Sequence, residues 1–250
     1  MELALTSAFV ALGVLLFLLF LGGRQARLVT TSTSQPARRA DAVPLVVSDF
    51  GYWVLGAFIP LFRTLHLTPN ALSVISLPAS LCASITIAMG RFGLGGPLLL
   101  FAFALDAWDG LLARALGTAS DAGEVVDATI DRYNDVIVML GFLYYYRDDL
   151  IPWLLASAGL LGTVVVSYTR AKGESFGVAT GIGFMQRHER ALWLGVATSI
   201  APALASLLEE PSRHPSYYAV VVALAAVAIG TNITAIRRAR LVVARLVSRR

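Results

Sequence analysis

The sequence is short of charge: only 14% of its 250 residues are Asp, Glu, Lys or Arg, whereas 57% are hydrophobic. In soluble globular domains about a quarter of the residues are charged. An ordinary soluble domain is therefore excluded, and the mean hydropathy of +0.71 agrees with this. Apolar stretches of about 20 residues, the length at which an α-helix spans a bilayer, recur along most of the chain. The sequence therefore predicts an all-α integral membrane protein.

Cysteine and histidine are also scarce. Cys82 is the only cysteine, which excludes an intrachain disulfide. His66, His188 and His214 are scattered along the sequence, so no Cys/His cluster with zinc spacing exists. The net charge is +4, but the sequence contains no nucleic-acid-binding motif. Nucleic acid is therefore not expected as a partner.

The first apolar run, Leu3–Gly23, contains no charged residue. A signal peptide is the alternative interpretation, but signal peptides begin with Lys or Arg, and only Glu2 precedes this run. We therefore expect a retained transmembrane helix. A polar, basic linker follows it and is expected to be irregular because it is rich in Ser, Thr and Pro.

Residues 50–65 repeat apolar side chains at helical spacing, but Gly51, Gly56 and Pro60 make this segment a poor membrane span. We expect it to lie in the membrane interface; a short transmembrane helix is the alternative. Thr68-Pro69-Asn70 is typical of an N-cap followed by the first turn of a helix. Six spans are then expected at about 69–90, 95–116, 121–146, 150–171, 188–208 and 215–236.

Basic residues indicate the orientation of these spans. Most of them lie at the ends of the spans that face one side of the membrane. Only Arg91, Arg147 and Arg213 lie at the ends that face the other side. The positive-inside rule then predicts a protein of the cell (inner) membrane with its N-terminus outside. Residues 24–45, 172–187 and 237–250 are expected in the cytoplasm, and residues 147–149 and 209–214 outside. The expected organisation is an extra N-terminal helix with a basic linker (1–45), a membrane domain of an interfacial helix and six spans (46–240), and a basic cytoplasmic tail (241–250).

Four aspartates interrupt the apolar sequence, in the stretches DAWDGLLAR and GEVVDATID. Asp106 and Asp109 share one helix face, and Asp127 and Asp131 share another. The two helices are joined by the turn at residues 115–120, and the acids lie at nearly equal distances in sequence on either side of it. Local helix geometry alone therefore brings the four acids to matching depths near the cytoplasmic surface.

Carboxylates at bilayer depth need compensation. Four of them suit two divalent cations, and hard oxygen ligands favour Mg²⁺ or Mn²⁺. The alternative is pairing with basic residues, for which only Arg114 and Arg132 lie nearby in sequence. Gly110, Ala113 and Gly123 leave room beside the acids for a ring or a phosphate chain, although small residues in membrane helices also permit close packing. The pattern favours a membrane enzyme that handles a phosphate-bearing substrate through carboxylate-held metal ions.

The run D-x2-D-G-x2-A-R-x8-G-x3-D-x3-D, from Asp106 to Asp131, resembles the signature of the CDP-alcohol phosphotransferases at every specified position. The resemblance extends over residues 46–240. It implies a six-helix membrane enzyme and homodimer that transfers a phosphoalcohol from cytidine diphosphate to an acceptor hydroxyl and releases CMP. It further implies CDP-diacylglycerol as the donor.

The resemblance also implies roles for individual residues. Asp106 and Asp127 would bridge two metal ions, Asp109 would complete the first site, and Asp131 would complete the second and act as the general base. The cytidine diphosphate of the lipid would be held by a set of small, polar and basic residues: Pro69, Asn70, Gly110, Ala113, Arg114, Ser120 and Gly123.

The acceptor is indicated by two basic clusters, SYTRAKGES (167–175) and QRHER (186–190). Arg170, Lys172, Arg187 and Arg190 flank one connection beside the aspartates, and such cations suit a phosphorylated acceptor. Both clusters resemble the inositol-phosphate-using branch of the family, with Gly173 in place of its usual alanine. Glycerol 3-phosphate is the alternative acceptor.

Two further classes compete with this interpretation. A membrane prenyltransferase also carries aspartate-rich motifs, but it lacks the Gly-x2-Ala-Arg and Gly-x3-Asp frame. A transporter would spread its acids along a path through several helices, whereas these four lie on two adjacent ones.

Overall fold

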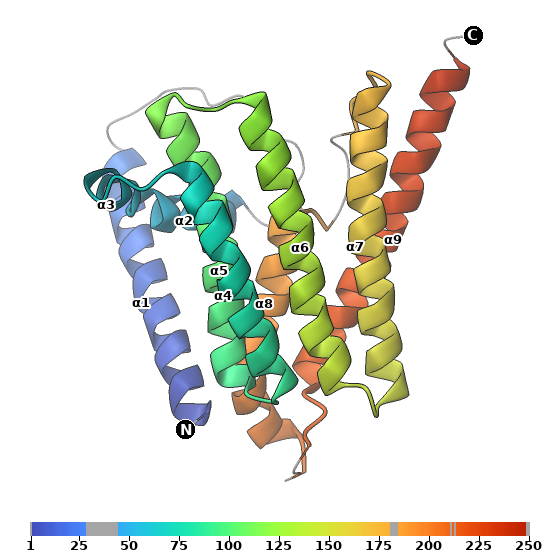
Figure 1. Cartoon of the computed structure of the whole chain (residues 1–250). Helices are drawn as coiled ribbons and strands as arrows, with labels where there is room; N and C mark the ends of the chain where they lie inside the picture. Colours follow the sequence, from blue (N-terminus) through green and yellow to red (C-terminus); the bar gives the residue numbers. More distant parts are fainter. Residues whose placement is uncertain (1, 29–44, 181–184, 211, 213, 249–250) are drawn as a thin grey trace.

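The computed structural model describes residues 2–28, 45–180, 185–210, 212 and 214–248. These residues form helices and connections without a β-strand, so the predicted all-α class is confirmed. Seven long helices and two short ones follow in chain order (Figure 1): α1 (Glu2–Leu28), α2 (Leu45–Gly56), α3 (Ile59–Thr64), α4 (Pro69–Ala88), α5 (Phe92–Leu116), α6 (Asp121–Tyr145), α7 (Leu150–Ser175), α8 (Arg187–Leu208) and α9 (Tyr218–Val247).

Six of these helices, namely α1, α4, α5, α7, α8 and α9, are long and apolar enough to cross a membrane. The aspartate-bearing α6 is equally long, with 25 residues, and lies alongside them in the bundle (Figure 1). The predicted six spans and the extra first helix are thus all present. The basic linker falls largely on residues 29–44, outside the described residues.

The predicted single interfacial helix at residues 50–65 is wrong in detail. Two short helices, α2 and α3, occupy this region and run crosswise to the long helices (Figure 1). The break follows Gly56, and Pro60 lies in the first turn of α3. Proline lacks the backbone N–H that would continue α2, so the chain restarts as a new helix.

The long helices approach closely because small residues face one another. A Cβ atom added at Gly96 of α5 would collide with the Ser199 backbone of α8, and one at Gly162 would collide with Thr231 of α9. On the other side of the bundle, a Cβ at Gly141 of α6 would lie 2.6 Å from the carbonyl oxygen of Ser84 on α4. Such contacts bring the backbones together in membrane helices.

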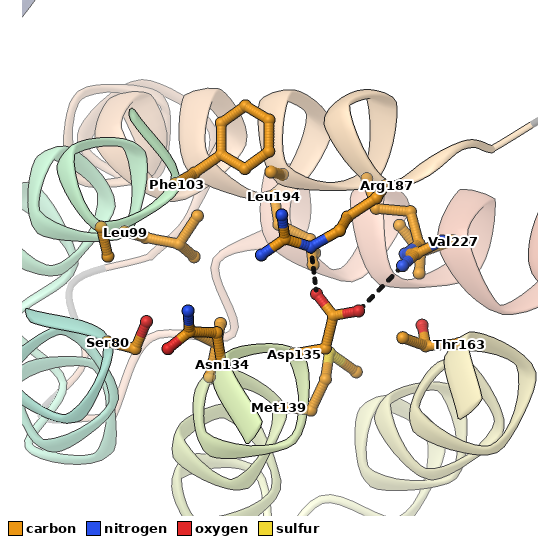
Figure 2. Close-up of a pocket in the computed structure, with 14 residues that line it drawn as sticks. Ser80, Leu99, Phe103, Asn134, Asp135, Met139, Thr163, Arg187, Leu194 and Val227 are labelled. Atoms are coloured by element: carbon orange, nitrogen blue, oxygen red, sulfur yellow. Dashed lines mark hydrogen bonds and ion pairs between the residues drawn. The ribbon is translucent and has the colours of Figure 1, made fainter. Parts of the chain in front are cut away.

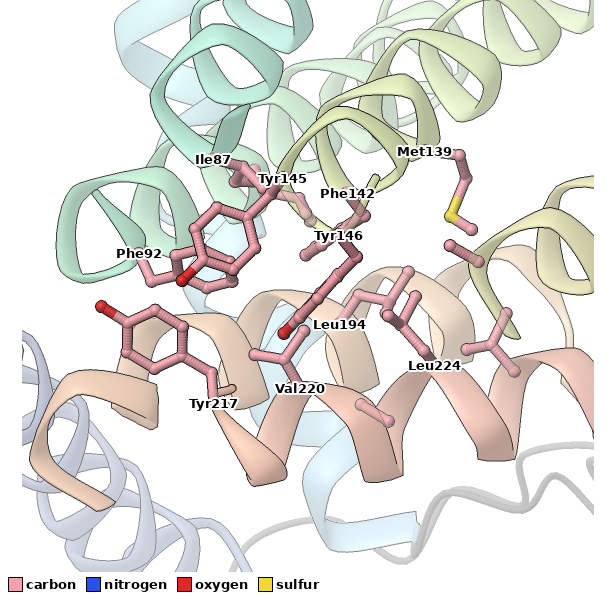
Figure 3. Packing of buried hydrophobic residues seen from close by; sticks show 14 of the residues in the cluster. Ile87, Phe92, Met139, Phe142, Tyr145, Tyr146, Leu194, Tyr217, Val220 and Leu224 are labelled. Carbon is pink, nitrogen blue, oxygen red and sulfur yellow. The ribbon is translucent and has the colours of Figure 1, made fainter. Parts of the chain in front are cut away.

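An aromatic and aliphatic core fills the half of the bundle where α4 ends and α5 begins. Figure 3 shows Phe92, Tyr145, Tyr146 and Tyr217 packed together there. The rings of Phe92 and Tyr217 stack at 4.3 Å, and the Tyr146 hydroxyl donates to the Ser216 carbonyl at 2.9 Å. The rigid core holds this end of the bundle, and the polar site lies toward the other.

Helix α1 packs against α5 and α8. The Glu2 carboxylate accepts a hydrogen bond from the backbone N–H of Gly93 at 2.7 Å, in the first turn of α5. Near its other end, Phe17 and Phe20 contact Phe50 of α2. From α2, the Leu55 carbonyl accepts a hydrogen bond from Trp108, the residue before Asp109. Helix α1 therefore contacts the start of α5 directly and its aspartate-bearing end only through α2.

Candidate active site

The turn between α5 and α6 fixes the relative register of the two aspartate pairs. Gly117 ends α5 with φ of 67°, a left-handed conformation that glycine adopts without steric cost. The Thr118 N–H then bonds the Ala113 carbonyl at 3.0 Å. Ser120 begins α6 as its N-cap and accepts from the Gly123 N–H at 3.2 Å. Local capping thus makes the short connection that the sequence predicts at residues 115–120.

Three of the four predicted metal ligands come together. One carboxylate oxygen from each of Asp106, Asp109 and Asp127 lies within 4.8 Å of the others, and we call these three residues the carboxylate cluster. Asp106 and Asp109 are buried, with 5% and 4% of their surface exposed. The Oδ1 atom of Asp106 is buried and has no hydrogen-bond partner among the described residues. Hard oxygen donors that repel one another, one of them without a partner, fit a divalent cation.

The fourth aspartate, Asp131, shares an arginine with Asp106 of the cluster. Arg187 at the start of α8 bonds Asp106, lies 2.8 Å from the Oδ1 atom of Asp131 and lies 3.6 Å from Asp135. Helix α8 begins well below the level at which α7 ends (Figure 1), which carries Arg187 to the depth of the aspartates. The cluster is therefore compensated in part by a cation that lies 81 residues from Asp106 in sequence.

In the sequence, only Arg114 and Arg132 lie close enough to the aspartates to be expected to compensate their negative charge. Arg132 lies 3.6 Å from Asp131, whereas the guanidinium of Arg114 lies over Gly110, 3.3 Å from where a Cβ atom would stand. Arg187 was assigned to the acceptor instead, because nothing local in the sequence connects it to the aspartates.

A large cleft of about 1140 Å³ opens at the α5–α6 turn. It is lined by α3, α4, α5 and α6, and Asp109 and Asp127 contribute to its wall, whereas Asp106 and Asp131 do not. All the residues predicted to hold the cytidine diphosphate line it: Pro69, Asn70, Gly110, Ala113, Arg114, Ser120 and Gly123. Arg63, which sequence reasoning missed, also lines the cleft and donates to the Ala115 carbonyl at the end of α5.

A second, much smaller pocket of about 50 Å³ lies deeper in the bundle. Figure 2 shows Arg187 of α8 reaching toward Asp135 of α6, with Asn134 and Ser80 beside Asp135. Arg190 also lines the pocket, bonding Asp135 at 2.9 Å and the Met185 carbonyl at 3.2 Å. Asp135 thus holds two arginines of α8 beside the carboxylate cluster.

The four predicted acceptor-binding cations divide into two groups. Arg187 and Arg190 are at the deep pocket. Arg170 and Lys172 lie exposed near the end of α7, where Arg170 pairs with Glu174 at 2.9 Å and the Lys172 ammonium lies 4.9 Å from the centre of the Phe176 ring. No contact joins the two groups among the described residues.

Asp109 has a further partner on α4 that the sequence did not indicate. The Ser73 hydroxyl donates to the Oδ2 atom of Asp109. Ser76 and Asn134 continue a series of buried hydrogen bonds from Ser73 toward α6. The sequence does indicate a polar face on α4, because the spacing of the serines at positions 73, 76, 80 and 84 places them on one side of the helix.

Comparison with known proteins identifies the family. The model of CDP-alcohol phosphatidyltransferases matches residues 66–231. This chain belongs to that family. It is thus a membrane-embedded transferase, and the match covers all helices from α4 to α8 and about the first half of α9.

Individual relatives agree with this assignment. The archaetidylinositol phosphate synthase of Pyrococcus horikoshii is 35% identical over 136 residues, which are 54% of this chain and 71% of that protein. The crystal structure of Mycobacterium tuberculosis phosphatidylinositol phosphate synthase with CDP-DAG bound is similar, with a TM-score of 0.64 and 25% identity over 76% of this chain and 94% of that one. A structure of the same enzyme in complex with manganese and citrate has the same TM-score and identity, and covers 75% of this chain and 88% of that one.

Proposed function

We propose that this protein transfers the phosphatidyl group of CDP-diacylglycerol to a hydroxyl of inositol phosphate, with release of CMP, as a step of phospholipid biosynthesis. The observation that carries the proposal is the position of the carboxylate cluster, between a large cleft that fits the CDP-lipid and two arginines, one half-buried and one buried, that suit an anionic acceptor. The names of the two relatives, an archaetidylinositol phosphate synthase and a phosphatidylinositol phosphate synthase, support this acceptor.

Two divalent cations, Mg²⁺ or Mn²⁺, fit the donor set. The residues that would hold these ions are the four aspartates of the motif, Asp106, Asp109, Asp127 and Asp131. When bound, the ions would offset the negative charge of the diphosphate and of the leaving CMP. The manganese complex of the M. tuberculosis enzyme supports this choice of metal.

The residues of the large cleft bind and orient the CDP-lipid in this proposal. Arg114 and Arg63 supply positive charge, Ser120 and Asn70 supply hydrogen bonds, and Gly110 leaves room for the diphosphate to approach α5. The lipid thereby presents its phosphorus beside Asp109 and Asp127, the two cluster members in the cleft wall.

Asp131 acts as the general base in this mechanism. It lies on the side of the cluster that faces Arg187, away from the CDP-lipid cleft. Its carboxylate takes the proton of the acceptor hydroxyl as the acceptor oxygen forms a bond to the phosphatidyl phosphorus. The bond from that phosphorus to the CMP oxygen breaks, and CMP leaves with the bonding electrons.

The phosphate of the acceptor is assigned to Arg187 and Arg190. Both are guanidinium groups held in place by Asp135, and guanidinium groups match phosphate with paired hydrogen bonds. Arg170 and Lys172, exposed near the end of α7, complete the site by attracting the anion at longer range.

A CMP-release assay with purified protein, Mg²⁺ and CDP-diacylglycerol tests this function. Inositol phosphate should support turnover, whereas free inositol and serine should not. Preference for glycerol 3-phosphate would retain the cationic pocket but change the acceptor. Efficient use of unphosphorylated inositol would refute the pocket, and the absence of CMP release with every acceptor would refute the transferase activity.

Neutralising Arg187 is expected to weaken the use of inositol phosphate. A charge-assisted hydrogen bond contributes about 1.5–3 kcal/mol, so Arg187→Gln should raise the KM for the acceptor by about ten- to a hundredfold. The KM for CDP-diacylglycerol should change little, because Arg187 does not line the large cleft. Steady-state kinetics with each substrate varied in turn measures both values.

The matched comparison is Arg170→Gln, because Arg170 is exposed and paired with Glu174. Its effect on the acceptor KM should be smaller and should disappear at high salt, since only long-range attraction is lost. Equal effects of the two variants would contradict the assignment of the phosphate to the deep pair.

We also propose that the active site faces the cytoplasm of the cell membrane. Basic residues of α7 and α9 lie at the end of the bundle that bears the α5–α6 turn (Figure 1), which the positive-inside rule places inside. The divisions 1–45, 46–240 and 241–250 are retained as the proposed organisation, with the final segment continuing α9 as a helix to Val247. The family resemblance supports a homodimer, which the mass of the purified protein in detergent would test.

Single cysteines test the orientation, in a background where Cys82 is replaced by serine. A cysteine at Asp148, whose side chain is 78% exposed, should react with a membrane-impermeant thiol reagent in intact cells. A cysteine at Ser175, at the end of α7, should react only after lysis. The opposite labelling pattern would overturn the orientation.

A further inference from the structure

We infer that Ser73 positions Asp109 within the carboxylate cluster, and that Ser76 and Asn134 in turn hold Ser73. One face of α4 thereby sets how tightly the cluster binds a divalent cation. The inference deepens the proposed function and rests on its metal site.

The first contact is the one between Ser73 and Asp109. The Ser73 hydroxyl has one hydrogen and two acceptors within reach: the Asp109 carboxylate, and the Pro69 carbonyl at 3.3 Å. The carboxylate is nearer and charged, so it takes the hydrogen. This bond fixes the rotation of the Asp109 carboxylate and leaves its remaining lone pairs for a cation.

The next contacts fix the direction of the series. The amide nitrogen of Asn134 can only donate, and it donates to Oγ of Ser76 at 2.7 Å. The single hydrogen of Ser76 is therefore directed to the Ser73 carbonyl, at 2.6 Å. Ser73, Ser76 and Asn134 are each at most 5% exposed, so water does not compete for these bonds.

The series also joins the helices that make the site. Asn134 lies one turn after Asp131 on α6, Ser73 and Ser76 lie on α4, and Asp109 lies on α5. A displacement of α6 relative to α4 would therefore change the position of the Asp109 carboxylate. Groups that orient metal ligands in this way typically change metal affinity or activity by about 10–100-fold when they are removed.

The competing interpretation is that these serines only permit close packing of helices, which is common in membranes. Ser84 fits that interpretation, because it lies on the same face of α4 and packs against Gly141 of α6, far from the aspartates. It differs from Ser73 in having no contact with the carboxylate cluster among the described residues. Ser84→Ala is therefore the matched control for Ser73→Ala.

The experiment measures Mn²⁺ binding to the purified, detergent-solubilised protein by electron paramagnetic resonance, without substrate. Ser73→Ala should weaken Mn²⁺ binding by about 10–100-fold. Ser73→Thr keeps the hydroxyl and should bind Mn²⁺ like the wild type. Asn134→Ala should weaken binding less than Ser73→Ala, because it acts through two further bonds and leaves the Ser73 hydroxyl in place. The melting temperature in EDTA reports the packing contribution of each side chain.

Ser84→Ala should change the melting temperature without changing Mn²⁺ affinity. Unchanged affinity in Ser73→Ala would overturn the positioning role, and so would equal losses in Ser73→Ala and Ser84→Ala. If Ser73→Ala does not fold, wild-type affinity in both Ser76→Ala and Asn134→Ala would overturn the role of the series. Absence of Mn²⁺ binding in the wild type would instead refute the metal site of the proposed function, which distinguishes the two failures.

Discussion

Asp131→Asn is expected to slow phosphatidyl transfer by about 10²–10⁴-fold, the usual contribution of a general base. Asparagine has nearly the same shape as aspartate but cannot accept the proton of the acceptor hydroxyl. The loss should appear in kcat. Binding of CDP-diacylglycerol should persist, because Asp131 does not line the large cleft.

Two controls separate this effect from general damage. Asp148→Asn neutralises an exposed aspartate at the other end of α6 and should leave kcat unchanged. Equilibrium binding of a labelled CDP-lipid should be similar in Asp131→Asn and in the wild type. A loss of kcat smaller than about tenfold would contradict the role of Asp131 as the base.

Asp106→Asn is expected to abolish Mn²⁺ binding and to reduce turnover by about a thousandfold or more. Metal ions in such sites contribute several kcal/mol to the transition state, and each 1.36 kcal/mol corresponds to a tenfold change in rate. Asp106 is the cluster member that also bonds Arg187, so the amide removes a ligand from the centre of the site. Electron paramagnetic resonance and CMP release measure the two effects.

The same substitution should not destabilise the metal-free protein. It removes one of three mutually repelling carboxylates, while Arg187 keeps its contacts with Asp131 and Asp135. The melting temperature in EDTA should therefore equal or exceed that of the wild type. A variant that binds Mn²⁺ like the wild type would refute the assignment of Asp106 as a ligand.

Features encoded within a single helix or turn could be predicted from the sequence. The Thr68-Pro69 helix start and the α5–α6 turn follow from local capping and helical periodicity, and the structure has them as predicted. The residues predicted to hold the CDP-lipid came from the family resemblance, and they line the large cleft from the first turn of α4, from α5 and from the start of α6.

Contacts between distant helices could not be predicted in the same way. Arg187 reaches Asp106 only because α8 begins deep in the bundle (Figure 1), and Ser73 reaches Asp109 only because α4 packs on α5. The serine spacing on α4 indicates a polar helix face, but it does not indicate which residue of another helix that face contacts. The prediction of a single interfacial helix was wrong for a different reason. The apolar spacing continues through Gly56 and Pro60, but the proline lacks the N–H that would continue the helix.

The contact between Glu2 and Gly93 has a consequence for how the protein assembles. Helix α1 is synthesised first, but its neighbours α5 and α8 follow much later in the chain. Contacts of such high sequence separation are slow to form, because a long segment must be ordered before they can close. Docking of α1 is therefore a late event in folding, and until then the Glu2 carboxylate has neither the Gly93 N–H nor Arg91 as a partner. Helix α1 is thus made before α5 and α8 and docks only after they are in place.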